Sequence, residues 1–240
     1  MALQEKDFIE IEFTGRIKDT GEIFDSNIQA DLDTAGLQKQ EVKPFAFALG
    51  QGMFLKGIDE FLIGKEQGEY NIELSPEKAF GLRSSELVQL MPIKVFAQQK
   101  INPVPGAVFN FDGRMGKVLS ASGGRVMIDF NHPMAGKTVI YDVKILRKIE
   151  DMNEKIGAFV NFLFRKDFNF EVKSNKIVLE VEKAMSKFAQ MFEEKFKELF
   201  GLGLEIKEIA EQAEKIVEKA VSEKNLDKAK DISEEADPSE

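Results

Sequence analysis

The stretch that most constrains the fold of this chain is residues 44–63, where three patterns follow one another. Bulky and small apolar residues alternate from Phe45 to Leu49, which predicts a strand with one bulky face. Gly50 and Gly52 then predict a tight turn, because glycine adopts backbone conformations that other residues avoid. Whatever follows such a turn is expected to fold back over the sheet to which the strand belongs.

The segment after this turn is short and apolar, apart from the polar pair Asp59 and Glu60. We expect residues 58–63 to form one or two turns of helix over the sheet, with Asp59 and Glu60 on the outer face. A strand, a glycine turn and a short apolar helix would together enclose a small apolar hollow. That hollow is the first candidate for a binding site.

Alternation of period two recurs in four other segments, which are residues 9–13, 23–25, 70–74 and 139–146. Each segment predicts a half-buried strand. Residues 27–43 are polar and predict a loop. The fold class expected from these patterns is α+β, with an antiparallel sheet wrapped over one short helix.

Residues 84–131 differ in composition from the segments on either side. Two Xaa-Pro steps are followed by glycine turns at Asp112-Gly113 and Gly123-Gly124. Apolar residues alternate on either side of these turns, which predicts a meander of β-hairpins. We interpret the segment as an inserted, mainly-β domain.

Residues 151–211 form a third block, interpreted as a C-terminal α/β domain. Apolar spacing predicts a helix over residues 156–164. Residues 170–182 predict a hairpin that turns at Ser174-Asn175, and residues 204–209 predict a strand, with the start of a helix as the alternative. The remaining residues, 212–240, form an acidic tail that is expected to be helical at first and then disordered.

Three phenylalanines in this block, Phe188, Phe192 and Phe196, recur every four residues. Helical side chains four residues apart lie on one face, so the pattern predicts one amphipathic helix. The simplest interpretation is that the aromatic face belongs to the core of the domain. The alternative is a seam between two copies of the chain, since a block this small has little interior in which to bury so many rings.

Composition excludes several classes of function. The chain has no Cys and a single His, which excludes disulfides and thiol catalysis. Its net charge of −9 argues against nucleic-acid binding. The start of the chain is polar, and the longest uncharged run, residues 44–55, falls short of the roughly 20 apolar residues that span a membrane. We therefore expect a cytoplasmic protein with no membrane or nucleic-acid partner, no cofactor and no metal.

Four stretches, taken together and in order, resemble the FKBP-type peptidyl-prolyl isomerases. They are FTGRIKDTGEIFDSN (13–27), FAFALGQGMFLKGIDEFLIGK (45–65), SPEKAFG (75–81) and NHPMAGKTVIYDV (131–143). The insert before the last stretch resembles that of the SlyD-like branch and of long archaeal FKBPs. The resemblance implies a half-barrel isomerase domain (1–83 and 132–150), an inserted chaperone or flap domain (84–131) and a C-terminal domain that could form a dimer (151–211).

The resemblance also implies a set of pocket residues. They are Phe13, Phe24, Asp25, Phe45, Phe54, Leu55, Ile58, Phe80 and Tyr141. By this resemblance, Leu55 would offer its backbone N–H to a substrate carbonyl, and Asp25 would orient the imide at the rim. Met134 would close one side. From the residues alone the apolar members could equally be core, and Asp25 could simply form a turn.

Three of these positions depart from the commoner pattern of the family. Phe13 and Phe80 stand where tyrosine is usual, and Ile58 stands where eukaryotic members have tryptophan. Each lost hydroxyl removes a potential hydrogen bond, which typically contributes about 0.5–1.5 kcal/mol, so catalysis is expected to be weakened but not abolished. Loss of the tryptophan puts tight macrolide binding in doubt.

By analogy the insert would bind unfolded chains through methionine and other apolar side chains. The candidates are Met91, Val95, Phe96, Val104, Met115 and Met127. A segment this small cannot bury them all, and exposed methionines make an adaptable surface. Phe109 and Phe111 are expected instead to form the insert's own small core.

Two functions remain open from the sequence. The first is a peptidyl-prolyl cis-trans isomerase and folding chaperone that acts on unfolded or partly folded polypeptides with Xaa-Pro bonds. The second is a dimeric holdase whose isomerase pocket is weak or inactive, which the changes at Phe13, Ile58 and Phe80 would explain. A peptide isomerisation assay separates the two.

Overall fold

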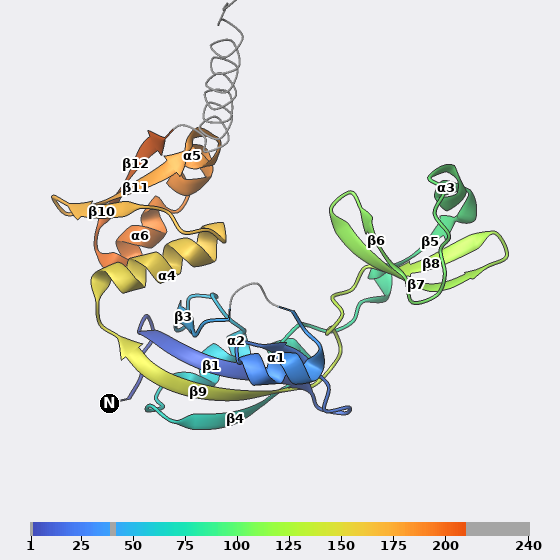
Figure 1. Ribbon diagram of the computed structural model, residues 1–240, viewed down its shortest axis with the longest axis horizontal. Coiled ribbons are helices and arrows are strands. Elements are labelled where there is room, and N and C mark those ends of the chain that lie inside the picture. The colour runs from blue at the N-terminus through green and yellow to red at the C-terminus, as the bar shows by residue number, and fades with distance from the viewer. Residues whose placement is uncertain (1, 39–41, 210–240) are drawn as a thin grey trace, which may run out of the picture. The chain divides into compact units, whose positions relative to one another are not determined.

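The computed structural model describes residues 2–38 and 42–209 of the 240-residue chain. It divides the chain into two compact units, Met1–Glu150 and Asp151–Glu240 (Figure 1). The elements of both units mix antiparallel strands with short helices, which confirms the predicted α+β class. Each unit is described below by itself. Within the described residues no helix is long and apolar enough to cross a membrane.

The main sheet of the first unit contains five strands. They are β1 (Phe8–Ile17), β2 (Ile23–Ser26), β3 (Phe45–Ala48), β4 (Glu69–Leu74) and β9 (Val139–Ile149). Their order is β2-β1-β9-β4, β3 also pairs with β1, and every pairing is antiparallel. All five strands were predicted from alternation, because each has one buried face and one partly solvated face.

The short helix α2 (Lys56–Leu62) follows β3 as predicted. Its residues Ile58 and Leu62 are fully buried against the sheet. The prediction that both acidic residues of this helix lie on the outer face is wrong for one of them. Glu60 is exposed, whereas Asp59 is only 5% exposed. The reason is that neighbouring parts of the chain cover more of the surface of α2 than an open sheet alone would cover, so Gly57 and Asp59 are buried together with Ile58 and Leu62.

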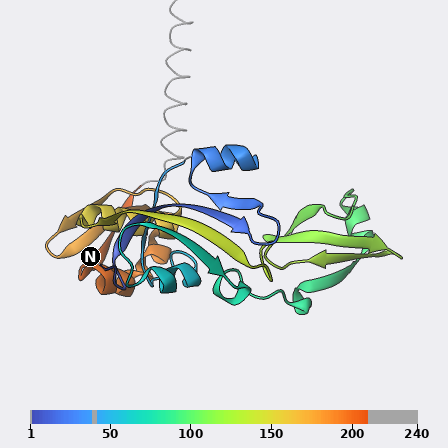
Figure 2. The ribbon, with the colours of Figure 1, turned by 90° about the horizontal axis from the view of Figure 1, so that it is seen from below.

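A second helix, α1 (Gln29–Ala35), stands where the sequence predicted a loop. Leu32 is its only fully buried residue, so the chain carries almost no apolar periodicity that could have revealed it. Gly36 ends the helix in the left-handed conformation. Seen from below in Figure 2, α1 lies on one side of the main sheet and α2 on the other.

The inserted segment forms a sheet of its own. It contains β5 (Val88–Pro92), helix α3 (Ile93–Gln98), β6 (Val108–Phe111), β7 (Arg114–Ser122) and β8 (Arg125–Asp129), and its strand order is β5-β8-β7-β6. The hairpins at Asp112-Gly113 and Gly123-Gly124 are confirmed. A simple meander is not, because β5 pairs with the last strand, and α3 was not predicted.

The insert has a small core of four buried residues, which are Phe96, Val118, Val126 and Ile128. Phe109 and Phe111 pack against it, as predicted. Two short 3-10 helices, Pro76–Lys78 and Ser85–Leu87, lie on the path from the main sheet into the insert.

The second unit contains α4 (Met152–Phe164), β10 (Phe170–Lys173), β11 (Lys176–Glu182), α5 (Lys183–Gln190), α6 (Glu193–Phe200) and β12 (Gly203–Ile209). The hairpin β10–β11 turns at Ser174 and Asn175 as predicted, and both residues have positive φ. The predicted strand at 204–209 is confirmed as β12, which pairs parallel with β11. The acidic tail after residue 211 lies outside the described residues.

The single helix predicted over the phenylalanine stripe is wrong. The chain breaks at Met191 and Phe192, so Phe188 lies on α5 and Phe196 on α6. Phe196 is fully buried against Phe159, whereas Phe188 is exposed. Two short helices, α5 and α6, connect β11 to the parallel strand β12. The helical segment is interrupted within this connection, at Met191 and Phe192.

Candidate active site

Seven phenylalanine and tyrosine rings from distant parts of the sequence form one continuous cluster in the first unit. They belong to Phe13, Phe24, Phe45, Phe47, Phe54, Phe80 and Tyr141. Phe54 lies at the centre, with its ring centroid 5.0 Å from that of Phe13, 5.4 Å from that of Phe45 and 5.7 Å from that of Tyr141. Most of these contacts are edge-to-face or tilted, the arrangements that aromatic rings prefer.

The cluster continues from Tyr141 to Phe24 at 5.8 Å and from Phe24 to Phe80 at 5.6 Å. Phe80 in turn stacks on His132, with a centroid distance of 4.7 Å and only 3° between the rings. The last contact is notable because the insert begins just after Phe80 and ends just before His132. The aromatic cluster therefore reaches the point where the insert leaves the main domain.

The predicted pocket residues, which include Asp25, Leu55 and Ile58 besides rings of the cluster, differ in exposure. Phe13, Ile58 and Tyr141 are buried. The half-buried members are Phe24, Asp25, Phe45, Phe54, Leu55 and Phe80. A buried layer beneath a partly exposed layer gives an apolar surface that an incoming group can reach.

Gly15 lets two of these rings meet over β1. A Cβ atom at this position would lie 2.9 Å from Cζ of Phe24 and 2.9 Å from Cζ of Tyr141. Gly15 is the register partner of Tyr141 on β9, so the tyrosine ring folds back over the glycine. Any side chain here would push the two rings apart.

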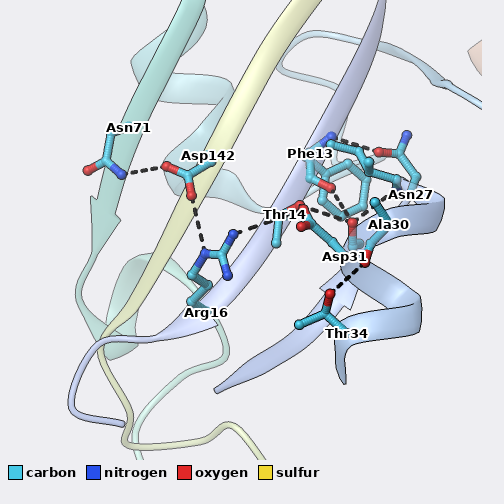
Figure 3. A network of polar contacts seen from close by, with 11 residues as sticks. Phe13, Thr14, Arg16, Asn27, Ala30, Asp31, Thr34, Asn71 and Asp142 are labelled. Carbon is cyan, nitrogen blue, oxygen red and sulfur yellow. Dashed lines mark hydrogen bonds and ion pairs between the residues drawn. The ribbon is translucent and has the colours of Figure 1, made fainter. Parts of the chain in front are cut away.

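The backbone of Phe13 is fixed by polar side chains that follow β2 (Figure 3). Its N–H donates to Oδ1 of Asn27 at 2.7 Å, and its carbonyl accepts from the Ser26 hydroxyl at 3.0 Å. The Asn27 amide also donates to the carbonyls of Ile11 and Lys43. Sequence reasoning took this segment for a surface turn. Its residues are buried and hold the floor of the cluster in place.

A polar network covers the opposite face of the sheet and includes α1 (Figure 3). The buried hydroxyl of Thr14 bonds to Ser26 and to Asp31 of α1. Beside it, Asp142 accepts from Arg16 at 3.3 Å and from Asn71 at 2.6 Å. These contacts join β1, β9, β4 and α1 on the side of the sheet away from the rings. Phe13 and Thr14 thus project to opposite faces of the same strand.

Asp25 and Tyr141 influence each other electrostatically. Burial raises the pKa of the Tyr141 hydroxyl, and the negative charge of Asp25 raises it further. Tyr141 therefore keeps its proton at any physiological pH and can donate a hydrogen bond. Asp25 is half-buried, and its charge is close enough to act on this hydroxyl.

The sequence of the chain is similar to those of several known proteins. The chain is 28% identical to the short-type peptidyl-prolyl cis-trans isomerase of Methanocaldococcus jannaschii over 146 residues, which cover 60% of this chain and 92% of that protein. It is 33% identical over 122 residues to the FKBP-type 16 kDa peptidyl-prolyl cis-trans isomerase of Escherichia coli K12, covering 48% of this chain and 81% of the relative. The chain belongs to the FKBP-type peptidyl-prolyl cis-trans isomerases.

Other comparisons concern the branch of the FKBP family. The chain is 28% identical over 152 residues to the SlyD protein of Helicobacter pylori, covering 62% of this chain and 76% of that one. A family model described as "FKBP26, IF domain" matches residues 89–134. That range contains α3 and strands β6 to β8 of the insert, together with most of β5.

Three of the apolar residues predicted for the FKBP site are not aromatic. Ile58 is a fully buried residue of α2. Leu55 is the residue before α2, and its carbonyl accepts from the N–H of Ile58 at 2.9 Å. Met134 is half-buried, and its N–H donates to Nδ1 of His132 at 3.2 Å. Met134 is thereby linked to the histidine that stacks on Phe80.

The residues predicted to bind substrate on the insert differ widely in exposure. Met115 is 58% exposed, and Val104 is also exposed. Met91, Val95 and Met127 are half-buried. The expectation that Phe96 is an exposed contact is wrong, because it is 2% exposed in the core of the insert. Its ring fills the space under α3, and this position could not be read from composition.

Three exposed apolar residues of the insert were not predicted from the sequence, and they are Leu90, Ile93 and Val108. Leu90 pairs with Met127, Val108 pairs with Lys117, and Asn110 pairs with Met115. Directly paired residues lie on one face of a sheet. The apolar outer face of the insert is therefore formed by Leu90, Val108, Met115 and Met127, on the side away from Val118, Val126 and Ile128. The alternation in β5 and β6 was the signal that could have found it.

Metal ligands do not gather in the described part of the chain. Across residues 2–38 and 42–209, no three side chains of His, Cys, Asp or Glu come close enough together to hold a metal ion. The chemistry available at the aromatic cluster is that of apolar surface, the Tyr141 hydroxyl and the Asp25 carboxylate.

Proposed function

We propose that the protein catalyses cis-trans isomerisation of Xaa-Pro bonds in its aromatic cluster and binds unfolded polypeptide through the outer face of the insert. The observation that carries the first part is the cluster itself, in which buried rings lie beneath half-buried ones. A proline ring is apolar and flat enough to bind against half-buried Phe45 and Phe54, with buried Tyr141 behind Phe54.

The chemistry needs no nucleophile. Rotation about the peptide bond meets a barrier of about 18–20 kcal/mol because resonance stiffens the C–N bond. When the bond is twisted, resonance is lost and the group is less dipolar than in either planar form. An apolar, water-poor surface therefore favours the twisted state over the planar ground state, and this differential binding is catalysis.

Two polar groups, the N–H of Leu55 and the carboxylate of Asp25, would orient the substrate. The N–H of Leu55 makes no hydrogen bond within the described residues, so it is free to donate to a substrate carbonyl. The Tyr141 hydroxyl stays protonated and lies near Asp25. Asp25 at the edge would then orient the imide, and Leu55 would fix the substrate's backbone.

An isomerisation assay on a Xaa-Pro tetrapeptide tests the site. The parent protein should accelerate isomerisation. Phe45→Ala should lower kcat/KM by roughly tenfold or more, since it removes a ring that contacts both Phe13 and Phe54. Phe61→Ala is the matched control, because Phe61 is a half-buried phenylalanine of α2 whose ring contacts Tyr70 outside the cluster. An uncatalysed rate for the parent would contradict the proposal and favour the holdase.

The insert is proposed to capture unfolded chains and present their prolines to the cluster. Binding through the outer face would raise the local concentration of substrate, an effect that matters for proteins and not for short peptides. Exposed Leu90 and Met115 offer an adaptable apolar surface, on which many sequences can bind. The expected clients are unfolded or partly folded polypeptides with Xaa-Pro bonds.

Refolding of a proline-limited protein tests this division of labour. A double variant, Leu90→Lys with Met115→Lys, should slow catalysed refolding and leave tetrapeptide isomerisation unchanged. Asn110→Lys is the control, because it adds charge to the same face, opposite Met115, without removing apolar surface. An equal loss in both assays would show that the insert serves the cluster in some other way.

The second unit is proposed to join two copies of the chain. Met191 is 78% exposed, and Phe188 beside it contacts both Phe164 and Phe192. An exposed patch of this kind is suited to an interface between identical domains. Sedimentation should show a dimer for the parent and a monomer for Met191→Lys. A parent that is monomeric at all concentrations would exclude this interface.

A further inference from the structure

The face of the main sheet that lies away from the aromatic rings carries a cavity of about 550 Å³, which we call the outer cavity. It is lined by residues of the three neighbouring strands β1, β9 and β4, and by Ile28, the residue before α1. Its volume lies within the range of roughly 300–1,000 Å³ that ligand sites in proteins occupy. The isomerase function proposed above makes no use of this cavity.

The register of the sheet places the polar side chains of the outer cavity in rows across the strands. Glu12 of β1 pairs with Lys144 of β9, and Lys144 pairs with Glu69 of β4. In the next row Asp142 pairs with Asn71, and these two side chains bond to each other (Figure 3). Directly paired residues lie on one face of a sheet, so all five side chains share the outer face.

Negative charge is in excess in the outer cavity. Three carboxylates and one ammonium group line it, which leaves two negative charges without a matching cation. The neighbouring groups do not remove this excess. Arg16 lies 3.3 Å from Asp142 but also 4.0 Å from Asp31, whose charge offsets its own. Lys18 and Glu73, farther along the same face, form a neutral pair at 2.6 Å. The cavity is therefore complementary to a cation.

The three carboxylates of the outer cavity differ in their partners. Glu69 pairs with Lys144 at 3.0 Å, and Asp142 accepts from Asn71 at 2.6 Å. Glu12 is half-buried on the central part of β1, and within the described residues its carboxylate has no hydrogen bond or ion pair. A partly buried carboxylate is stabilised by a charged donor. Glu12 is thus the group to which the cation of a ligand would bind.

We propose that the outer cavity binds an arginine side chain of an extended polypeptide, with the guanidinium between Glu12 and Asp142 and the aliphatic part against Ile28. Glu12 and Asp142 are diagonal neighbours on the sheet, a relation that places side chains about 7–8 Å apart. A guanidinium is planar and carries five donors, so it can bond to two carboxylates at once, whereas an ammonium group is a compact point charge.

The choice of a polypeptide as the source of this side chain rests on the proposed function, in which unfolded chains are the substrates. The cavity and its charge do not depend on it, because the aromatic rings lie on the other face of the sheet. The site would give a bound chain a second point of attachment, away from the proline. The test therefore uses peptides without proline, which have no bond for the cluster to isomerise.

A titration of the full chain, followed by ¹H–¹⁵N NMR, tests the site directly. The acetylated and amidated peptide Gly-Gly-Arg-Gly-Gly should cause saturable shifts of the side-chain amide of Asn71 and of the backbone amides of Lys144 and Ile28. Replacing its arginine with citrulline, a neutral analogue of nearly the same shape, should weaken binding about tenfold or more. Equal affinities for the two peptides, or no shift at these residues, would overturn the proposal.

Two variants separate a built site from general attraction of charge. Glu12→Gln should weaken binding of the arginine peptide about tenfold. Glu73→Gln is the matched control, because it removes the same charge from the same face but lies outside the cavity, where Glu73 already pairs with Lys18. It should change the affinity by less than about twofold. Equal losses in the two variants would overturn the proposal.

Ethylguanidinium serves as the free cation in the same titration. It should bind more weakly than the peptide, and binding as tight as that of the peptide would overturn the assignment to a polypeptide. Failure of the isomerase function gives a different result, in which the parent does not accelerate tetrapeptide isomerisation but still distinguishes arginine from citrulline.

Discussion

The main sheet and the sheet of the insert share one structural feature, which has a different consequence in each. In each, a glycine on a strand lets large side chains fold over the backbone. Gly15 of β1 lies beneath Phe24 and Tyr141, and Gly116 of β7 lies beneath Ile128 and Phe130. In the main sheet the rings above the glycine belong to the candidate active site. In the insert, Ile128 is one of only four buried core residues, and Phe130 packs against this core.

The difference shows what the size of a sheet allows. The main sheet buries one face of long strands, such as β1 and β9, and can hold a few rings in fixed positions. The insert has four strands, of which only β7 exceeds five residues, and one short helix, and apolar side chains such as Leu90 remain on its outer face. Rings held in fixed positions are suited to catalysis, whereas exposed and adaptable apolar side chains are suited to binding polypeptides of varied sequence.

The two glycines provide the strongest test of this comparison. Gly15→Ala should lower tetrapeptide kcat/KM by about a hundredfold, since its Cβ would displace the rings of Phe24 and Tyr141. Gly116→Ala, where a Cβ would lie 2.6 Å from Cγ2 of Ile128, should leave tetrapeptide isomerisation unchanged and impair catalysed refolding. If Gly116→Ala slowed both reactions equally, the two sheets would not be functionally separate.

The second test measures the free energy of unfolding as a function of pH. Helix α2, which packs against the main sheet, buries the carboxyl group of Asp59, whereas the core of the insert is apolar. The pKa of Asp59 is raised to about 6 in the folded protein, so the folded chain binds a proton where the unfolded chain does not. The free energy of unfolding should therefore increase as pH falls from about 6 toward 4, by up to about 3 kcal/mol, and this gain should be lost as pH rises through 6.

Denaturant unfolding at a series of pH values measures this dependence. Asp59→Asn should remove it, whereas Glu60→Gln should retain it. Groups whose pKa is lowered in the folded protein, such as Asp129 near Asn131 and Arg83, act in the opposite direction only at lower pH. A parent whose stability is constant between pH 4 and 6 would show that Asp59 is less buried than it is here.

A third test compares two asparagines that link backbone segments. Asn27 bonds to the backbone of Phe13, Ile11 and Lys43, and it is buried. Asn131 bonds to the backbone of Ser84, where the insert leaves the main domain, and it is half-buried.

Asn27→Ala should lower the free energy of unfolding by about 2–3 kcal/mol, because it leaves a buried N–H and buried carbonyls unpaired. Asn131→Ala should cost about 1 kcal/mol, since water can reach the groups it exposes. Thermal or denaturant unfolding checks both values. Equal losses would mean that the hydrogen bonds of Asn131, where the insert leaves the main domain, contribute as much to stability as those of Asn27 in the main sheet.

The smallest effect is expected on the outer face of the insert. Val108→Thr should change stability by less than about 0.5 kcal/mol, because the residue is exposed. It should reduce catalysed refolding about twofold and leave the peptide rate alone, if the face binds clients by apolar contact. The same change at buried Val118 should destabilise the insert, and a refolding rate unaffected by Val108→Thr would place client binding elsewhere.

Much of the architecture followed from the sequence because it rests on local chemistry. Strands were predictable wherever one face is buried, since the side-chain period of two is imposed by the strand itself. The turn at Ser174-Asn175 was predictable because few residue pairs adopt positive φ together. The rings of the cluster were predicted only as a set, through resemblance, and their mutual contacts were not.

What only the tertiary structure decided depends on residues far apart in the sequence. The burial of Asp59, the helix α1 in a polar segment and the burial of Phe96 depend on what covers them, and no local pattern records that. The parallel pairing of β11 with β12 is likewise set by the two helices between them. Local periodicity fixes which face of an element is apolar, and long-range packing determines what that face meets.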